Sequence, residues 1–406
     1  MEAVLSKVMK TRSLNRAAAL AALLASAAAA QTLSPLRREG GYYVQEQRGD
    51  LPAAFRLRIS STGAVNVEGG VGQRVTYELV RKVKASSEAE AQRLLDQAPL
   101  TAARQGGSVT MRIDKPGCWN CGFSATLHVS TPHATQEAII STSSGQIHVS
   151  NIEGRVNADT AAGAILAENI GAGVRATTAG GPITLGAIGG PVRCETAGGP
   201  IKVGTVRGEA VLSTSGGRIE VGEVQGGLRA ETSGGDITAQ RVGGPVFAGT
   251  SGGVIQIGEA VGRVVAETAG GSIEIAKAPE GVTADTAGGH IRLTEVAGAI
   301  RAASAAGNIE AVFLDGRPVG DSLIETNAGT IVVFLPATLH VAVDASVDFA
   351  RSLNRIESDF ADIQVVRSGN GAGSNEVRAV GALNGGGPVL RIRNTSGRIQ
   401  IRRLPE

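Results

Sequence analysis

A threonine returns at every eighteenth position through the middle of this 406-residue chain, without an insertion. The series consists of Thr142, Thr160, Thr178, Thr196, Thr214, Thr232, Thr250, Thr268 and Thr286. Ser304 continues the series, and the motif recurs in weaker form at Thr326 and Thr395. A fixed period of this length is typical of architectures in which each repeat contacts only its neighbours. The period therefore predicts about ten stacked coils of 18 residues.

Each coil divides into two nine-residue halves, as in IEVGEVQGG (219–227) followed by LRAETSGGD (228–236). Apolar residues such as Ile219 and Val221 alternate with polar ones, which is the pattern of a half-buried strand. The glycine pairs that close many halves predict tight turns with positive φ. We expect the threonine at each strand end to face inward and cap the turn through its hydroxyl. The predicted fold is all-β, a flattened parallel β-solenoid.

Composition agrees with a thin stack of small side chains. Glycine accounts for 57 residues, and aromatic residues for only 3% of the chain, whereas a large globular core relies on aromatic side chains for buried area. Basic and acidic residues nearly balance, 39 against 37, and give a net charge of +2. There is no electrostatic case for nucleic-acid binding.

The N-terminus reads as a secretory signal peptide. Four basic residues, Lys7, Lys10, Arg12 and Arg16, precede an apolar run from Ala17 to Ala30. The small residues at its end predict cleavage between Ala30 and Gln31, although an amphipathic helix is the alternative and translation from Met9 would give a more compact signal. The run is short for a membrane span, and no other stretch is long and apolar enough. We expect an exported mature chain without a transmembrane span.

The rest of the chain divides into three regions, of which the repeat is the middle one. We predict an N-terminal β-rich cap over 31–141, solenoid repeats over 142–311, and C-terminal strands with a cap over 312–406. Strand-like runs in these flanks are FRLRI (55–59), VTYELVRKV (75–83), SVTMRI (108–113), SATLHV (124–129), IVVFLP (331–336), LHVAVDA (339–345) and VLRIRNTSGRIQI (389–401). A flexible tract is expected at 368–376, and one short helix over 86–97, with Ser87 as its N-cap.

Three motifs are similar to those of a known family: the repeated TSGGxIxV unit, the Leu335–Pro336 strand end, and the C-terminal segment ALNGGGPVLRIRNTSGRIQI. Together with the signal peptide, they resemble the exported bacterial β-strand-repeat proteins known as putative adhesins, a family of largely unknown function. The resemblance covers nearly all of the mature chain. It implies the solenoid fold, export and adhesion, and it supplies no catalytic residues.

Cys118 and Cys121 form a CxxC pair in PGCWNCG. In an exported protein this spacing favours a local disulfide that pins a turn. A redox motif would require the first cysteine at a helix N-terminus, and a zinc site would require two more ligands, for which His128 and His133 are the nearest candidates. Cys194 occupies an inward repeat position and is interpreted as core packing.

The outward positions carry a charge pattern. Asp159, Glu195, Glu231 and Glu267 recur every 36 residues. The pattern favours a solvated charged face, with a cation site as the alternative. Calcium-binding β-rolls place Asp ligands in a GGxGxDx turn, and these turns lack them.

We therefore predict a non-catalytic structural or binding protein of the bacterial envelope, periplasmic or at the cell surface, without a cofactor. The expected partner is an unidentified envelope protein or glycan, and self-assembly is an option. One alternative is an envelope-stress or signalling accessory that binds a membrane protein. The other is a carbohydrate-active β-helix enzyme. The enzyme would need a groove of converging charges, usually with aromatic residues for sugar stacking, whereas the coils offer only Phe247 as an aromatic residue and an isolated His290.

Overall fold

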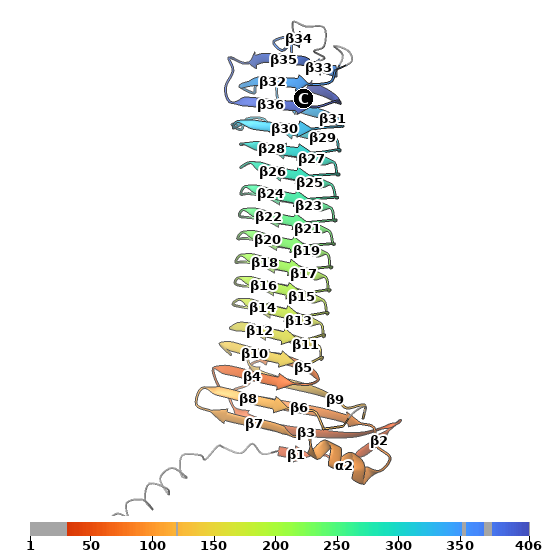
Figure 1. Ribbon diagram of the computed structural model, residues 1–406. Coiled ribbons are helices and arrows are strands. Elements are labelled where there is room, and N and C mark those ends of the chain that lie inside the picture. Colours follow the sequence, from red (N-terminus) through yellow and green to blue (C-terminus); the bar gives the residue numbers. More distant parts are fainter. Residues whose placement is uncertain (1–30, 119–120, 351–354, 369–375, 406) are drawn as a thin grey trace, which may run out of the picture. The chain divides into compact units, whose positions relative to one another are not determined.

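The computed structural model describes residues 31–118, 121–350, 355–368 and 376–405, and it contains two compact units (Figure 1). The first unit comprises 31–145 and 151–154, and the second comprises 146–150 and the residues from 155 onward. The predicted signal peptide, 1–30, lies outside the described residues. Most of the predicted flexible tract at 368–376 lies outside them too.

The second unit is built from strands that alternate between two parallel sheets (Figure 1). The sheet that carries the threonine series, called the Thr sheet, contains β12 (Arg155–Thr160), β14 (Val174–Thr178), β16 (Val192–Thr196), β18 (Ala210–Thr214), β20 (Leu228–Thr232), β22 (Val246–Thr250), β24 (Val264–Thr268), β26 (Val282–Thr286), β28 (Ile300–Ser304) and β30 (Ser322–Thr326). The opposite sheet, called the Ile sheet, contains β13 (Ile165–Ile170), β15 (Ile183–Ile188), β17 (Ile201–Val206), β19 (Ile219–Val224), β21 (Ile237–Val242), β23 (Ile255–Ala260), β25 (Ile273–Ala278), β27 (Ile291–Val296), β29 (Ile309–Phe313) and β31 (Thr330–Leu335). β11 (Ile147–Ile152) contains residues of both units.

Neighbouring strands pair in register at a spacing of one coil. Ile219 pairs with Ile237, and Leu228 pairs with Val246, each 18 positions further on. Stacking like residues on like residues gives every coil the same packing, so each coil is a template for the next. The predicted flattened parallel β-solenoid with 18 residues per coil is confirmed.

The core of this unit consists of small apolar side chains from both sheets. Along β19, Ile219, Val221 and Val224 are buried, whereas Glu220 and Glu223 point outward. Two successive outward residues separate Val221 from Val224, and the same break in strict alternation recurs in every Ile-sheet strand from β13 to β27.

The eighteen-residue period ends after Ser304, because 22 positions separate it from Thr326. The extra residues lie in the connection between β29 and β30, at 314–321. Thr326 nevertheless donates its hydroxyl to the carbonyl oxygen of Gly307 at 3.0 Å, so this side chain still bonds the turn of the preceding coil despite the longer connection.

The C-terminal strands do not stack in chain order. They are β32 (Val341–Val347), β33 (Ile356–Ser358), β34 (Gln364–Ser368), β35 (Glu376–Leu383), β36 (Val389–Asn394) and β37 (Arg398–Arg403). β36 pairs in parallel with β30 on one side and with β32 on the other, so it lies between them (Figure 1). β37 likewise pairs with β31 and β33. The last coil of the sequence, formed by β36 and β37, is therefore inserted between two coils that precede it in the chain. The antiparallel strands β35 and β34 follow β32 at the end of the sheet.

The position of β36 shows that Thr395 does not continue the threonine series. Asn394, not Thr395, is the in-register partner of Thr326. Its amide donates to the carbonyl oxygen of Gly329 at 2.9 Å, and its Oδ1 accepts from the backbone N–H of Gly397. Asn394 thus makes the same two contacts as a threonine of the series.

The turn glycines also require a correction. In pairs such as Gly216–Gly217, neither residue has a φ in the left-handed region, so the expectation of positive φ there is wrong. A Cβ on Gly217 would instead lie 2.0 Å from the carbonyl oxygen of Gly199 on the preceding coil. Close stacking of coils, rather than backbone conformation, demands glycine at this position.

The first unit contains two sheets and a helix. One sheet holds β1 (Gln31–Leu33), β2 (Arg37–Glu39), β3 (Tyr42–Pro52), β6 (Arg74–Val83), β9 (Ser124–Pro132) and β5 (Ala64–Gly70). The other holds β7 (Leu100–Gln105), β8 (Ser108–Ile113), β4 (Arg56–Ser61) and β10 (Glu137–Thr142). Helix α2 (Glu88–Asp96) begins as predicted, because the side chain of Ser87 accepts a hydrogen bond from the N–H of Glu90.

A buried arginine holds the other end of α2. Ala91 and Leu95 of the helix pack against Val83 of β6. The guanidinium of Arg81 donates to the carbonyl oxygens of Leu95 and Ala98 at 2.9 and 2.8 Å. Since the last carbonyls of a helix lack partners within it, these bonds stabilise its C-terminus.

Candidate binding surface

The threonine series forms a ladder of backbone contacts between coils. Thr214 donates its hydroxyl to the carbonyl oxygen of Gly199 at 2.9 Å and accepts from the N–H of Gly217 at 3.2 Å. The same two contacts recur at Thr178, Thr196, Thr232, Thr250, Thr268, Thr286 and Ser304. Thr160 accepts from the N–H of Gly163, and Thr142 donates to the carbonyl oxygen of Gly145. Each hydroxyl of the repeated pattern already serves two backbone groups of the turns.

A second ladder of side chains was missed by the sequence analysis. Asp236, Ser272, His290 and Asn308 each accept a hydrogen bond from the backbone N–H of the equivalent residue one coil later, at 2.7–3.2 Å. Pro182 and Pro200 occupy the same column and have no N–H to satisfy. His290 is therefore a turn residue rather than a merely solvated one. In the sequence, these positions are marked by a polar residue directly before the isoleucine that begins an Ile-sheet strand.

Two columns of outward side chains run along the Thr sheet. The first, called the ridge column, consists of Asn157, Arg175, Arg193, Val211, Arg229, Phe247, Val265, Thr283, Arg301 and Leu323. The second, called the acidic column, lies two residues further along each strand and consists of Asp159, Thr177, Glu195, Ser213, Glu231, Gly249, Glu267, Asp285, Ala303 and Glu325. The ridge column contains no acid, and the acidic column contains no base.

Ion pairs within single strands connect the two columns. Arg193 pairs with Glu195 at 2.5 Å, and Arg229 pairs with Glu231. The guanidinium of Arg229 also lies 4.4 Å from the ring centroid of Phe247 on the next coil. Among the described residues, none forms an ion pair with Glu267.

A shallow groove of about 880 Å³ follows the acidic column over several coils. Its lining includes the carboxylates of Glu231, Glu267, Asp285 and Glu325, together with small residues of the following turns. Phe247 also lines the groove, and no lysine or arginine does. The groove forms where small residues follow the threonine of successive turns, as at Ser251, Ala269 and Ala287.

The Ile sheet presents a different surface. Its outward charges alternate in sign from coil to coil, so that ion pairs run between neighbouring strands. Lys277, for example, lies 3.8 Å from Glu259 and 4.0 Å from Glu295. Both faces pair their own charges, but each outward column of the Ile sheet mixes the two signs, whereas the Thr sheet keeps bases and acids in separate columns.

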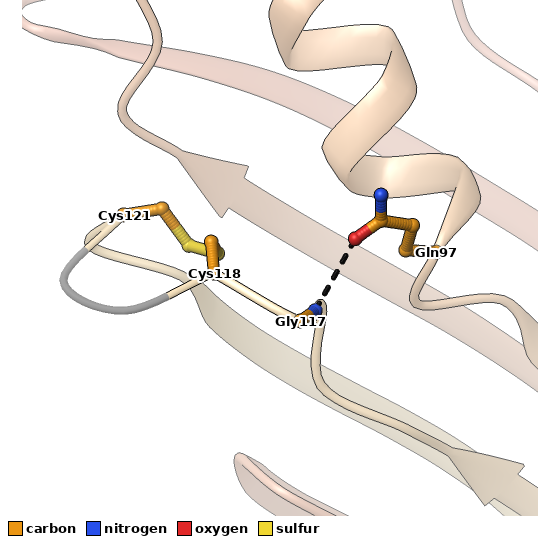
Figure 2. The surroundings of a disulfide bond; sticks show 4 residues. All are labelled: Gln97, Gly117, Cys118 and Cys121. Atoms are coloured by element: carbon orange, nitrogen blue, oxygen red, sulfur yellow. Dashed lines mark hydrogen bonds between the residues drawn. A yellow bond between two sulfur atoms is a disulfide. The ribbon is translucent and has the colours of Figure 1, made fainter.

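Cys118 and Cys121 are bonded in a disulfide in the loop between β8 and β9 (Figure 2). The loop is held to α2, because the side-chain oxygen of Gln97, the helix C-cap, accepts from the N–H of Gly117 at 3.2 Å. Cys121 also packs against the buried cluster under the helix. Cys118 does not lie at a helix N-terminus, which is the setting that activates a redox cysteine.

The histidines near this loop do not complete a zinc site. Nδ1 of His128 contacts the side-chain amide of Asn66, whereas His133 contacts the carbonyl oxygen of Asn151 and the carboxylate of Glu153. Among the described residues, no group of three or more His, Cys, Asp or Glu side chains is arranged to hold a metal.

Cys194 lies in the core of the solenoid. It pairs in register with Ala176 and Leu212 on the neighbouring coils, and it is fully buried. Burial raises the pKa of this thiol, so the nucleophilic thiolate is disfavoured.

Of the described residues, none belongs to a helix long and apolar enough to cross a membrane. No family model matches the chain, and no curated protein matches it. Several solved structures show similarity to the chain. One is a "putative cell adhesion protein" from Clostridium sporogenes, 8% identical over 93% of this chain and 100% of that one, with a TM-score of 0.16. Another is a "putative adhesin" from Bacteroides fragilis, 9% identical over 88% of this chain and 97% of that one, with a TM-score of 0.20. A "putative adhesin" from Parabacteroides distasonis is 12% identical over 71% of this chain and 96% of that one, with a TM-score of 0.24. These neighbours are bacterial proteins named as adhesins.

Proposed function

We propose that this chain is a non-catalytic binding or structural protein of the bacterial envelope, acting as an adhesin or scaffold. The observation that carries the proposal is the pair of charge columns on the Thr sheet, with the groove beside them. Such a surface recognises a partner by many repeated polar contacts. Its partner is an envelope protein or a glycan.

Two features support placement in the periplasm or at the cell surface. The sequence of residues 1–30 has the order of charges and apolar residues of a secretory signal. The disulfide between Cys118 and Cys121 suits an oxidising compartment, because cytosolic thiols are kept reduced. Fractionation of cells that express the full chain tests this placement. Recovery of the uncleaved chain in the cytoplasm would contradict it.

Binding is tested with the purified protein and immobilised envelope polysaccharides and envelope proteins. We expect saturable binding, weakened by Glu267→Lys in the groove and unchanged by Glu274→Lys on the Ile sheet. The Glu274 variant is the matched control, because it makes the same charge change on an exposed residue of the other face. Equal loss of binding in both variants would argue against the groove.

The same assay separates the enzyme alternative, which the carboxylate-lined groove motivates. A carbohydrate-active enzyme would release shortened products from the polysaccharide, and Glu267→Gln or Asp285→Asn would abolish their release. The proposal predicts binding without product formation. Turnover that depends on these carboxylates would replace it.

A further inference from the structure

The outward face of the Thr sheet is complementary to itself. In every coil from β12 to β30, the ridge column offers an arginine, an apolar residue or a neutral polar one, and the acidic column offers a carboxylate or a small residue. Where Arg193 and Arg229 stand in the first column, Glu195 and Glu231 stand in the second. In a closed twofold dimer, both copies use the same surface patch, and every contact between two residues occurs twice. A face that carries complementary columns can therefore bind a second copy of itself.

We propose that, when no envelope partner occupies the groove, the chain forms a twofold dimer through this face, with the ridge column of each copy lying in the groove over the acidic column of the other. Arg229 of one copy then lies against Glu231 of the second. Arg301, which pairs with Asp285 and Glu325 of its own chain at 3.7 and 3.4 Å, also lies between the same two residues of the second copy. The apolar ridge residue Phe247 covers the part of the groove floored by Gly249 and the small turn residues.

Symmetry selects one orientation of the two stacks. When the twofold axis runs along the stack, the two columns exchange places, and each ridge column faces an acidic column at the same coil. When the axis runs along the strands, the ridge column faces itself, and arginine meets arginine. Like charges placed opposite one another are unfavourable, so the two solenoids run in the same direction.

The available area suits a stable dimer. Ten strands at about 4.8 Å spacing and five residues at about 3.4 Å give a face of roughly 800 Å² per chain. This value equals the amount that each partner typically buries in a specific interface. The Ile sheet is the poorer candidate, because exchange of its two outward columns would place Glu220 of one copy opposite Glu223 of the other.

Charge reversal tests the dimer. In a ridge variant, Arg229→Glu and Arg301→Glu place acids in both columns. In a groove variant, Glu231→Arg and Glu325→Arg place bases in both columns. Sedimentation equilibrium of the purified protein should show a dimer for the unchanged chain, at least tenfold weaker association for either variant alone, and a restored dimer when the two variants are mixed.

The matched control carries Arg241→Glu and Arg292→Glu, the same charge change as the ridge variant but on the Ile sheet, and it should remain a dimer. Circular dichroism confirms that each variant is folded. A monomeric unchanged chain at about 100 µM, a failure of mixing to restore the dimer, or dissociation of the control would each overturn the proposal.

Spin labels test the orientation. Thr177→Cys and Ala303→Cys lie seven coils apart, or roughly 34 Å at the strand spacing. Each singly labelled dimer should give a short distance between its two labels, below about 20 Å, because each label faces the same coil of the partner. Distances near 34 Å in either dimer would mean opposed stacks and would contradict the proposal. The fully buried Cys194 does not compete for the label.

Discussion

Nη2 of Arg393 lies 2.7 Å from Oδ2 of Asp344, although 49 positions separate the two residues in the chain. They meet because β36, which carries Arg393, lies beside β32. Arg378 of β35 contacts the same carboxylate from the other side, at 2.9 Å. Asp344 therefore links three neighbouring strands at the C-terminal end of the sheet.

Hydrogen bonds from Arg393, and then from Arg378, lower the pKa of Asp344 to about 2. Because this folded-state pKa lies below the unfolded value of about 4, the carboxylate stabilises the fold fully above pH 4. That contribution is lost as the pH falls to about 2. Asp344→Asn should lower the free energy of unfolding by about 1–2 kcal/mol at pH 7 and by little at pH 2, as measured by urea unfolding. The exposed Asp362→Asn is the control and should have no effect at either pH.

Removal of residues 388–406 should destabilise the second unit as a whole. It deletes β36 and β37, so β30 and β32 lose their shared partner, as do β31 and β33. Unpaired strand edges promote aggregation. We expect a lower melting temperature and aggregates in size-exclusion chromatography, and partial rescue by a peptide of residues 384–406. A truncated chain that melts like the full one would show that the inserted coil is dispensable.

Ile219→Asp should abolish folding of the solenoid, with a loss of at least about 4 kcal/mol, because it buries an unpaired charge. Ile219 is fully buried and pairs with Ile201 and Ile237 on the neighbouring coils. Glu220→Lys on the same strand should cost less than about 1 kcal/mol, since its ion pairs with Lys202 and Arg218 are exposed. Thermal unfolding compares the two. A milder effect at position 219 than at 220 would mean that the faces are reversed.

Thr214→Val should lower the free energy of unfolding by about 1–3 kcal/mol, because it leaves the N–H of Gly217 and the carbonyl oxygen of Gly199 without their partner. Thr214→Ser keeps the hydroxyl, as Ser304 does naturally, and should cost less than half as much. Chemical denaturation measures both. Equal losses would mean that the methyl group, not the hydroxyl, supplies the stabilisation.

Gly217→Ala should cost about 2 kcal/mol or more, because its Cβ would lie 2.0 Å from the carbonyl oxygen of Gly199 and force the coils apart. The neighbouring Gly216→Ala should be tolerated, since its nearest contact would be 3.8 Å. Thermal melts of the two variants provide the comparison. Similar melting temperatures would indicate that the stack absorbs a methyl group at either position.

The flanking strands were partly accessible from sequence. SVTMRI (108–113) coincides with β8, and the run at 389–401 covers β36 and most of β37. The order in which the C-terminal strands pair was not accessible, because β36 joins partners that lie far from it in the chain. The sequence of the C-terminal segment resembles one more repeat at the end of the stack, whereas its strand β36 lies between β30 and β32.

The binding surface was also only partly predictable. The acidic recurrence at Glu195 and Glu231 is visible in the sequence, because outward positions follow from strand alternation. The groove is not visible there, since the depth of a groove depends on how small side chains in successive turns stack in three dimensions. The second turn ladder at Asp236 and His290 was missed for a related reason, because its partners are backbone groups of the next coil.

The sequence by itself determined the eighteen-residue coil, the two faces of every strand and the inward threonine column. These properties depend on nearest neighbours in a one-dimensional stack, so a local pattern repeated without insertions is sufficient. Only the tertiary structure decided that Gly217 is required by the coil beneath it, that Asn394 takes the place of a threonine, and that the last coil lies beneath an earlier strand. Each of these depends on atoms brought together by stacking, and their distances are not encoded in the spacing of residues along the chain.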